Sequence, residues 1–318
     1  MHSKEMLQEC GIKIPPQTIK DFISSLFCKP PNDQYFLFNA CLSSTCDMCG
    51  NLSLLDECLH ENALTTFGQQ LVEVKRFKTI EYPLKDEKIG RRCDLVTDKV
   101  SCHAFMDEFK SVIIPKYVKH SQYSRWLDGQ FHICKNTFPI GTILSVVDFA
   151  ENYTLAPQEE VQPQYYNSVQ VTIYVHIVYR HAPDSTEEDQ ILLREYHFYI
   201  SDNKLHSSEF VQYCFKVLYD NLKERQIQMT QHWIWSDNCT GQFKNARMFY
   251  WLSRTHRQTN IQHVWSFFEA GHGKGERDGV DAYVKRVLTR EQLIFEEKAK
   301  FKNAHEIVEW CNKYLYTG

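Results

Sequence analysis

The sequence lacks any apolar run of the roughly 18 to 20 residues that a helix needs to cross a bilayer. Its first residues, MHSKEMLQECG, also lack the charged and apolar regions of a secretory signal peptide. No internal repeat and no long low-complexity tract is found. We therefore expect a soluble intracellular protein without a membrane partner, and 43% apolar residues in 318 are enough to form a large core.

Strong net charge is also missing, because the formal net charge at pH 7 is −4. The whole molecule therefore has no general attraction for nucleic acid, and such binding would depend on local basic faces. Residues 242–302 contain 12 Lys and Arg against 7 Asp and Glu. This local excess suggests a basic face, and an ordinary solvated helical surface is an equally good interpretation.

A phosphate-binding P-loop is absent as well. The glycine-rich segment GHGKGERDG, residues 271–279, has the wrong spacing and no Lys-Ser or Lys-Thr at its end. A nucleoside triphosphatase is therefore not expected. The glycines still allow the backbone to approach a phosphate closely, and Lys274 would supply positive charge there.

The twelve cysteines are spread through a long chain and bunch only near its start, which favours a reducing compartment and one metal cluster over a disulfide scaffold. The spacing C-x12-C-x4-C-x2-C favours Zn²⁺, with the CxxC pair as the strongest part of the signal. Such a site would be structural because four protein ligands leave no open position. Cys58 or His60 could replace the first ligand, and unligated buried thiols are the alternative. The candidate ligands are Cys28, Cys41, Cys46 and Cys49.

Three regions can be drawn along the chain. Residues 1–98 are rich in cysteine and turn residues and are expected to form a zinc-organised module. Residues 99–139 show helical spacing and are expected to form a helical connector with an interruption or kink at Pro115. Residues 140–318 show strand patterns and then helix patterns in the order βββαβαβα. That order predicts an α/β domain of the RNase H-like type, with a mixed sheet flanked by helices.

Three aspartates occupy special places in this order. Asp148 closes the first strand, Asp237 follows the fourth, and Asp278 begins the last helix. If the first and fourth strands are neighbours, the first two acids lie side by side and the helix can supply the third. Carboxylates suit Mg²⁺ or Mn²⁺, and a pair of such ions about 3.5 to 4 Å apart supports phosphoryl transfer. Turn or cap roles are the ordinary alternative, and other nearby acids are possible ligands: Glu151, Glu276 and Asp281.

Polar and basic residues stand close to these acids in the sequence. Gln242 and Lys244 come a few residues after Asp237, and Lys285 and Arg286 lie on the helix that begins at Asp278. Together with Lys274 they are candidate contacts to a nucleic-acid backbone, and such contacts give affinity that depends on salt but not on base sequence.

Five segments carry a resemblance to a known family: VVDFAENY, EVQ at residues 160–162, VTIYVHIVY, SDNCTGQFKN and FFEAGHGKGERDGVDAYVKR. In this order they resemble a group of transposon-derived proteins scattered in animal genomes, and the likeness extends from about Cys28 onward. The resemblance implies an RNase H-like core of the DDE/D transposase kind, with Asp148, Asp237 and Asp278 at the acidic positions. It also favours Cys28 and Cys41 as zinc ligands.

The chain departs from the family in two places, with DGVDAY where the family commonly has DGIGGT and QPQYY where it often has QSAHW. Neither change removes an acid. The expected function is a transposase-like polynucleotidyl transferase or nuclease that acts on DNA in the nucleus, as a monomer or a homo-oligomer. The alternatives are a catalytically inactive DNA- or chromatin-binding protein with the same ancestry and, third, an interaction protein without a nucleic-acid partner.

Overall fold

The computed structural model describes residue 28 and residues 38–43, 45–49, 68–83, 89–155, 169–269, 276–294 and 301–315. The chain divides into two compact units, residues 1–126 and 127–318. Helix α7, Ile114–Thr137, begins in the first unit and ends in the second. The two units are described separately.

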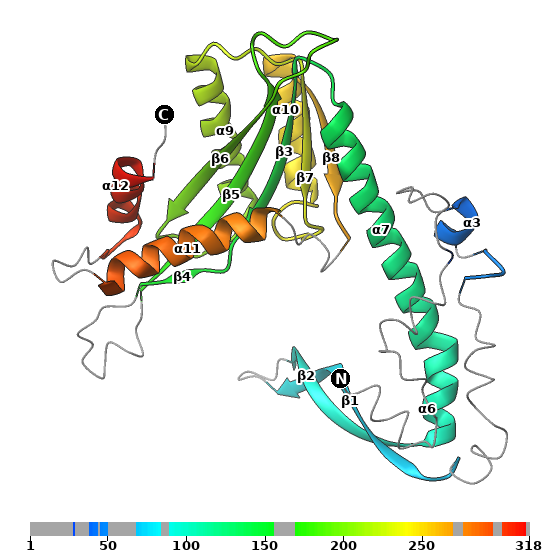
Figure 1. Cartoon of the computed structure of the whole chain (residues 1–318). Coiled ribbons are helices and arrows are strands. Elements are labelled where there is room, and N and C mark those ends of the chain that lie inside the picture. The colour runs from blue at the N-terminus through cyan, green and yellow to red at the C-terminus, as the bar shows by residue number, and fades with distance from the viewer. Residues whose placement is uncertain are drawn as a thin grey trace. The chain divides into compact units, whose positions relative to one another are not determined.

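A two-stranded antiparallel ribbon dominates the described part of the first unit (Figure 1). Strand β1, Leu71–Pro83, pairs with β2, Ile89–Ser101, along its full length. Val72 and Val74 are buried, whereas Phe77 and Leu95, which face each other across the ribbon, are exposed. No strand is predicted from the sequence before residue 140, so this ribbon is an unexpected element.

Helical structure follows the ribbon directly. The Ser101 hydroxyl accepts a hydrogen bond from the Ala104 amide and caps α6, Cys102–Glu108. A π-helical turn, η2, spans Phe109–Ile113, and α7 follows without a break. Pro115 has no amide hydrogen for an α-helical bond, so a widened turn just before it accommodates the missing bond. The expected interruption is thus a wider helical turn.

The second unit is built on a mixed sheet (Figure 1). Its strands are β3, Thr142–Phe149; β4, Tyr153–Thr154; β5, Gln170–His181; β6, Leu192–Ser201; β7, Gln231–Ser236; and β8, Gln262–Phe267. The main order is β6–β5–β3–β7–β8, and the short β4 pairs with the start of β5. The β5 strand runs antiparallel to its neighbours, while β3, β7 and β8 run parallel.

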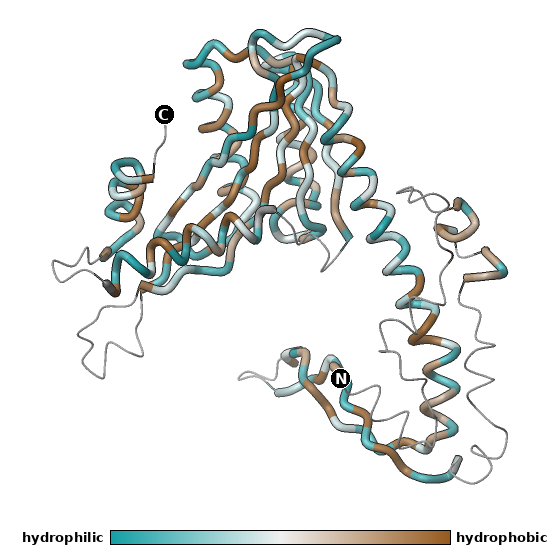
Figure 2. The backbone as a smooth tube through the Cα atoms, in the orientation of Figure 1, coloured by the Kyte–Doolittle hydropathy of each residue, from teal (hydrophilic) through white to brown (hydrophobic). Residues whose placement is uncertain are grey.

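Helices cover both faces of this sheet, which confirms the predicted mixed sheet flanked by helices. One face packs on α9, Ser208–Glu224, and α10, Ala246–Thr259, through a cluster that includes Val147, Phe215 and Met248. The other face packs on the end of α7, on α11, Glu276–Ile294, and on α12, Ala304–Tyr314. The central strands are apolar along most of their length (Figure 2), as expected when both faces are covered.

The caps explain where the helices begin. Ser207 accepts a hydrogen bond from the Phe210 amide at the start of α9, and Asn245 accepts one from the Met248 amide at the start of α10. Asn303 caps the start of α12 by accepting from the Glu306 amide. Helix α12 was not predicted from the sequence, although an Asn followed three residues later by a Glu is a helix-start signal.

A chain of buried polar side chains crosses the face of the sheet under α9. Ser145 lies between two imidazoles, with its Oγ 2.8 Å from His176 Nε2 and 2.7 Å from His232 Nε2. The Tyr219 hydroxyl, from α9, lies 2.9 Å from His232 Nδ1 and 3.0 Å from His263 Nε2. Burial lowers the pKa of His176 and of His232 well below the usual range, so both rings are neutral near pH 7.

Replacing Ser145 with Ala is expected to destabilise the second unit by roughly 2 to 4 kcal/mol, because it leaves one nitrogen on each of two fully buried rings without a partner. Urea unfolding followed by circular dichroism measures the change. Ser253→Ala is the matched control, since its exposed hydroxyl only bonds the Tyr250 carbonyl, and it should change stability by less than about 0.5 kcal/mol. Equal effects of the two substitutions would contradict the role given to Ser145.

Glu195 joins three elements near the β6 edge of the sheet. Its carboxylate accepts a hydrogen bond of 2.6 Å from Arg180 on β5 and two bonds, of 2.7 and 2.8 Å, from Arg225 at the end of α9. Burial acts to raise the pKa of Glu195, but the bonds from Arg225, His197 and Arg180 outweigh it and hold that pKa well below its usual range. The ionised carboxylate therefore stabilises the fold.

The stabilisation from Glu195 should depend on pH. Because its pKa is lower in the folded state, the contribution is present above the ordinary value of 4.5 and is lost as the pH falls below it. At pH 7, Glu195→Gln is expected to cost about 2 kcal/mol, and the difference from wild type should shrink as the pH is lowered from 5 to 3. Urea unfolding over that range tests this, with Glu188→Gln in an exposed loop as control. A difference that grows towards low pH would contradict it.

Candidate functional site

Two aspartates lie at neighbouring ends of parallel strands. In the pairing of β3 with β7, Val147 is opposite Ser236. The next residues of the two strands are Asp148 and Asp237, so the register brings them to the same edge of the sheet. Both are partly buried. We call this the carboxylate edge, and it is where the sequence analysis expected these two acids to meet.

Local hydrogen bonds fix the turn that carries Asp237. Its Oδ1 accepts a bond of 3.1 Å from the Cys239 amide, so the residue also has the turn-forming role considered as the alternative. The Ser236 hydroxyl donates to the Asp237 carbonyl and accepts from Trp265 Nε1 at 3.0 Å. The backbone at Asp237 is therefore held from the adjacent strand β8, and the carboxylate is oriented before any ligand arrives.

The starts of α9 and α10 meet at the same edge. Asn245 Nδ2, from the α10 cap, donates to Ser208 Oγ at 2.8 Å, and Ser208 Oγ donates to the Gly241 carbonyl at 3.3 Å. Both helices follow strands that end at this edge. Their N-terminal ends therefore add positive potential beside the carboxylates.

The DFAENY segment anchors the end of β3. The ring of Phe149 stacks on His206, with ring centroids 4.3 Å apart. Asn152 Oδ1 accepts hydrogen bonds from Thr172 at 3.1 Å and from His206 at 2.9 Å, for the tautomer with hydrogen on Nε2. The Tyr153 hydroxyl lies 3.1 Å from Thr289 Oγ1 and thus connects this segment to α11.

Helix α11 presents two described acids near its start, and a third, Glu291, near its end. Asp278 is exposed, whereas Asp281 lies on the stripe of the helix that also carries the buried Val284 and Leu288. Asp281 forms an ion pair of 3.0 Å with Lys285. Burial raises the pKa of Asp281; Lys285 opposes the rise, and the negative charges of Asp278 and Glu151 add to it. Glu151, which follows Asp148 by three residues, therefore lies close enough to α11 to affect the pKa of Asp281. The side chain of Glu276, another candidate, is outside the described residues.

The predicted nucleic-acid contacts differ in their surroundings. Lys244 is exposed, with its Nζ 5.2 Å from the centre of the Phe267 ring. Arg286 is exposed and lies over Tyr283, whereas the side chain of Lys285 is only 23% exposed and is paired with Asp281. Gln242 is partly buried in the turn after Asp237. Lys274 lies outside the described residues.

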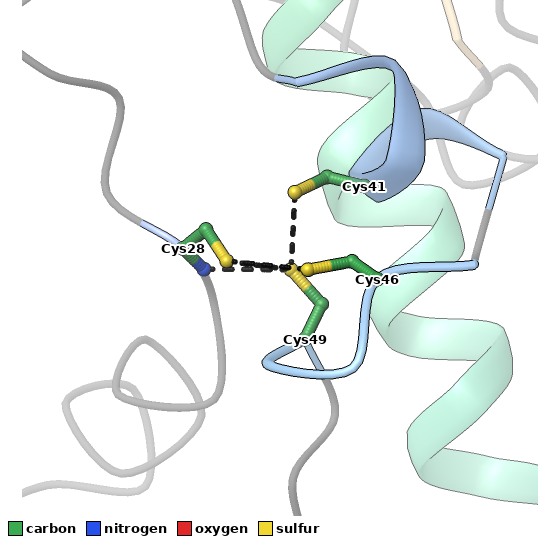
Figure 3. Close-up of side chains that lie close together, drawn as sticks. All are labelled: Cys28, Cys41, Cys46 and Cys49. Carbon is green, nitrogen blue, oxygen red and sulfur yellow. Dashed lines mark hydrogen bonds between the residues drawn. The ribbon is translucent and has the colours of Figure 1, made fainter.

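The four candidate zinc ligands come together at one point (Figure 3). The sulfur atoms of Cys28, Cys41, Cys46 and Cys49 all lie within 4.8 Å of one another. The distances from Cys49 Sγ to Cys28 Sγ and to Cys41 Sγ are both 3.4 Å. Four sulfurs at about 2.3 Å from a tetrahedral Zn²⁺ would be roughly 3.8 Å apart, so this group can hold a metal ion such as zinc. Among the described residues, the three aspartates do not form a set of this closeness.

The environment of the cysteines suits bound thiolates. Cys49 Sγ accepts hydrogen bonds from Gln122 Nε2 at 3.0 Å and from the Cys28 amide at 3.5 Å, and such bonds orient metal ligands. Without metal, backbone amides of Met48 and Cys49 lower the pKa of Cys46 to about 7, while burial raises the pKa of Cys28 to about 11. Gln122 is a residue that the sequence analysis missed. The alternatives Cys58 and His60 lie outside the described residues.

Comparison with known proteins places the second unit in a family. A family model described as "Domain of unknown function (DUF8701)" matches residues 129–317, which is more than half of the chain. The chain belongs to this family. No curated protein matches the sequence. The DUF8701 region contains the whole mixed sheet, the carboxylate edge and helix α11, whereas the four cysteines precede it.

None of the described helices of this DUF8701 protein combines the length and the apolar character needed to span a membrane.

Proposed function

We propose that this DUF8701 protein is a transposase-derived polynucleotidyl transferase or nuclease that acts on DNA in the nucleus, with an RNase H-like catalytic domain. The observation that carries the proposal is the placement of Asp148 and Asp237 at adjoining ends of two parallel strands. The sheet supports it, because the antiparallel strands β3, β5 and β6 are followed by β7 and β8, with α9 and α10 as the connecting helices. This is the arrangement expected of an RNase H-like domain.

The donor chemistry of the carboxylate edge fits hard divalent cations. Carboxylate oxygens are the ligands that Mg²⁺ and Mn²⁺ prefer, and the register of the two strands brings the two aspartates to the same edge. Asp148, Asp237 and an acid of α11 would hold the ions, with Asp278 as the residue that matches the family motif. When bound, such ions activate a water or a 3′-hydroxyl and stabilise the leaving oxygen of a phosphodiester.

The chain's own side chains would prepare this site for substrate. The Cys239 amide holds Asp237, and Tyr153 connects the end of β3 to α11 through Thr289. Lys244, exposed at the entrance to α10, is positioned to pair with a phosphate of the DNA backbone. The four cysteines would bind Zn²⁺ in a closed structural site in the separate N-terminal unit.

A second candidate is a DNA- or chromatin-binding protein of the same ancestry without chemistry. The exposed position of Asp278 and the absence of a close set of three acids among the described residues favour it. Full-length protein incubated with labelled DNA at low salt, with Mg²⁺, Mn²⁺ or EDTA, separates the two. Cutting or joining that needs a divalent ion supports the enzyme. Retention on DNA with no turnover under any of these conditions supports the binding protein and removes the catalytic proposal.

A further inference from the structure

Helix α10 carries a stripe of basic and aromatic residues on its solvent face. Arg247, Tyr250, Arg254 and Arg257 recur at intervals of three and four residues, which places them on one side of an α-helix. All four are exposed, whereas Met248 and Thr255 on the opposite side are buried. We call these four residues the arginine stripe.

The charge of this surface is unbalanced. Residues 246–259 contain no acidic residue. Arg247 is paired with Glu209 of α9, but no ion pair is found for Arg254 or Arg257 among the described residues. The guanidinium of Arg254 instead lies 6.0 Å from the centre of the Tyr250 ring, and Tyr250 is 65% exposed. An exposed aromatic ring beside uncompensated arginines offers both stacking and phosphate contacts.

The stripe also has a useful position. Helix α10 starts near the carboxylate edge, because its cap Asn245 donates to the Thr240 carbonyl in the turn that follows Asp237, and it packs on the sheet. Its residues from Arg247 to Arg257 span about 15 Å at 1.5 Å per residue. Along B-DNA this length corresponds to roughly four phosphates of one strand. A strand that follows the stripe would therefore lead to the acids.

We propose that the arginine stripe binds the phosphate backbone of the nucleic acid on which the carboxylate edge acts. This inference rests on the proposed function, which makes a nucleic acid the binding partner. It concerns binding only and does not require that the protein cuts or joins DNA. It adds a contact surface beyond the predicted backbone contacts, because the arginines of α10 are not among those residues. The partner is a nucleic acid, since arginine guanidinium groups match phosphate oxygens and the stripe leads to the proposed metal ligands.

The test compares two double variants of the full chain that remove the same amount of charge. Arg254→Ala with Arg257→Ala alters the stripe. Arg194→Ala with Lys313→Ala is the control, because these cations also lie near tyrosine rings, those of Tyr196 and Tyr314, but on β6 and α12. Affinity for a labelled DNA duplex is measured in EDTA between 50 and 200 mM salt. The stripe variant should bind more weakly, and its plot of log K against log salt should be shallower by about 2, at roughly 0.9 for each lost phosphate contact.

Three results would overturn the inference. The first is that wild type binds DNA and the stripe variant binds it with the same affinity and the same salt dependence. This result would leave the proposed function intact. Another is an equal loss in the control variant, which would mean a general charge effect. The third is wild-type protein that prefers polyglutamate to DNA, which would make an acidic protein the partner. Metal-dependent turnover of DNA is measured in a separate assay. If the wild-type protein shows no turnover but the stripe variant still binds DNA more weakly than wild type, only the catalytic proposal is refuted. Circular dichroism checks that both variants fold.

Discussion

Replacement of Cys46 by Ser is expected to prevent metal binding and to unfold the segment that carries the four cysteines, here called the cysteine module of the N-terminal unit. Among the described residues this part of the unit has few buried apolar side chains, with Cys41 as the buried residue of its short helix. A structural Zn²⁺ site of four ligands contributes an apparent free energy on the order of 10 kcal/mol to folding. Losing one of four thiolates should therefore remove most of the stability of this module.

Metal analysis and limited proteolysis measure the outcome. The wild-type chain should contain one Zn²⁺ per molecule, and Cys46→Ser should contain almost none and be cleaved rapidly before residue 68. Cys93→Ser is the matched control, because Cys93 is an exposed free thiol on β2. The role assigned to the cluster is wrong if Cys46→Ser keeps its zinc, or if a strong chelator leaves the proteolysis pattern unchanged.

Asp237→Asn is expected to reduce divalent-dependent cutting or joining of DNA by about a thousandfold or more while DNA binding in EDTA is kept. The substitution keeps the shape of the side chain and one oxygen for the Cys239 amide, but it removes the negative charge that would hold the ion. Loss of the several kcal/mol that a catalytic ion supplies corresponds to about a thousandfold in rate. Single-turnover assays with saturating Mn²⁺ measure the effect.

The same assay distinguishes the acids of α11. Asp278→Asn should match Asp237→Asn, whereas Asp281→Asn should mainly lower stability, because the Asp281 carboxylate is already paired with Lys285 at 3.0 Å. Unfolding temperatures of all three variants separate the two kinds of loss. If a stably folded Asp281→Asn protein is inactive and Asp278→Asn is active, the third ligand is Asp281. Full activity in Asp237→Asn would remove the catalytic assignment of the whole edge.

Most strands and helices of the second unit could be predicted from the sequence because their signals are local. Strand β5 is rich in apolar β-branched residues, which favour strands. Helix α9 begins after a Ser cap and has apolar residues at helical intervals. Each pattern depends only on neighbouring residues. The four cysteines could be predicted for a similar reason, since the CxxC spacing fixes two of the ligands within one turn.

Other features depend on contacts between distant residues and could not be read from the sequence. In β1, exposed and buried residues alternate strictly only over Leu71–Val74, and charged residues then occupy positions on both faces of the ribbon. Gln122 reaches Cys49 across 73 residues, and Ser145 reaches His232 across 87. No spacing rule predicts such pairs. Single histidines in strands gave the sequence analysis no reason to expect a connected chain, because their linkage depends on strand register.

The hydrogen bonds in the buried chain from His176 to His263 have a common direction. Ser145 and Tyr219 have one hydroxyl hydrogen each, and neutral His232 has one ring hydrogen. If every hydroxyl hydrogen is used, all four bonds must point the same way, so only two proton arrangements exist. In one of them the orphan N–H falls on the fully buried His176 ring, and in the other it falls on the partly exposed His263 ring. The tautomers of three imidazoles on three different strands are therefore set together, and in the second arrangement a proton gained at His263 Nε2 must reverse or break the row.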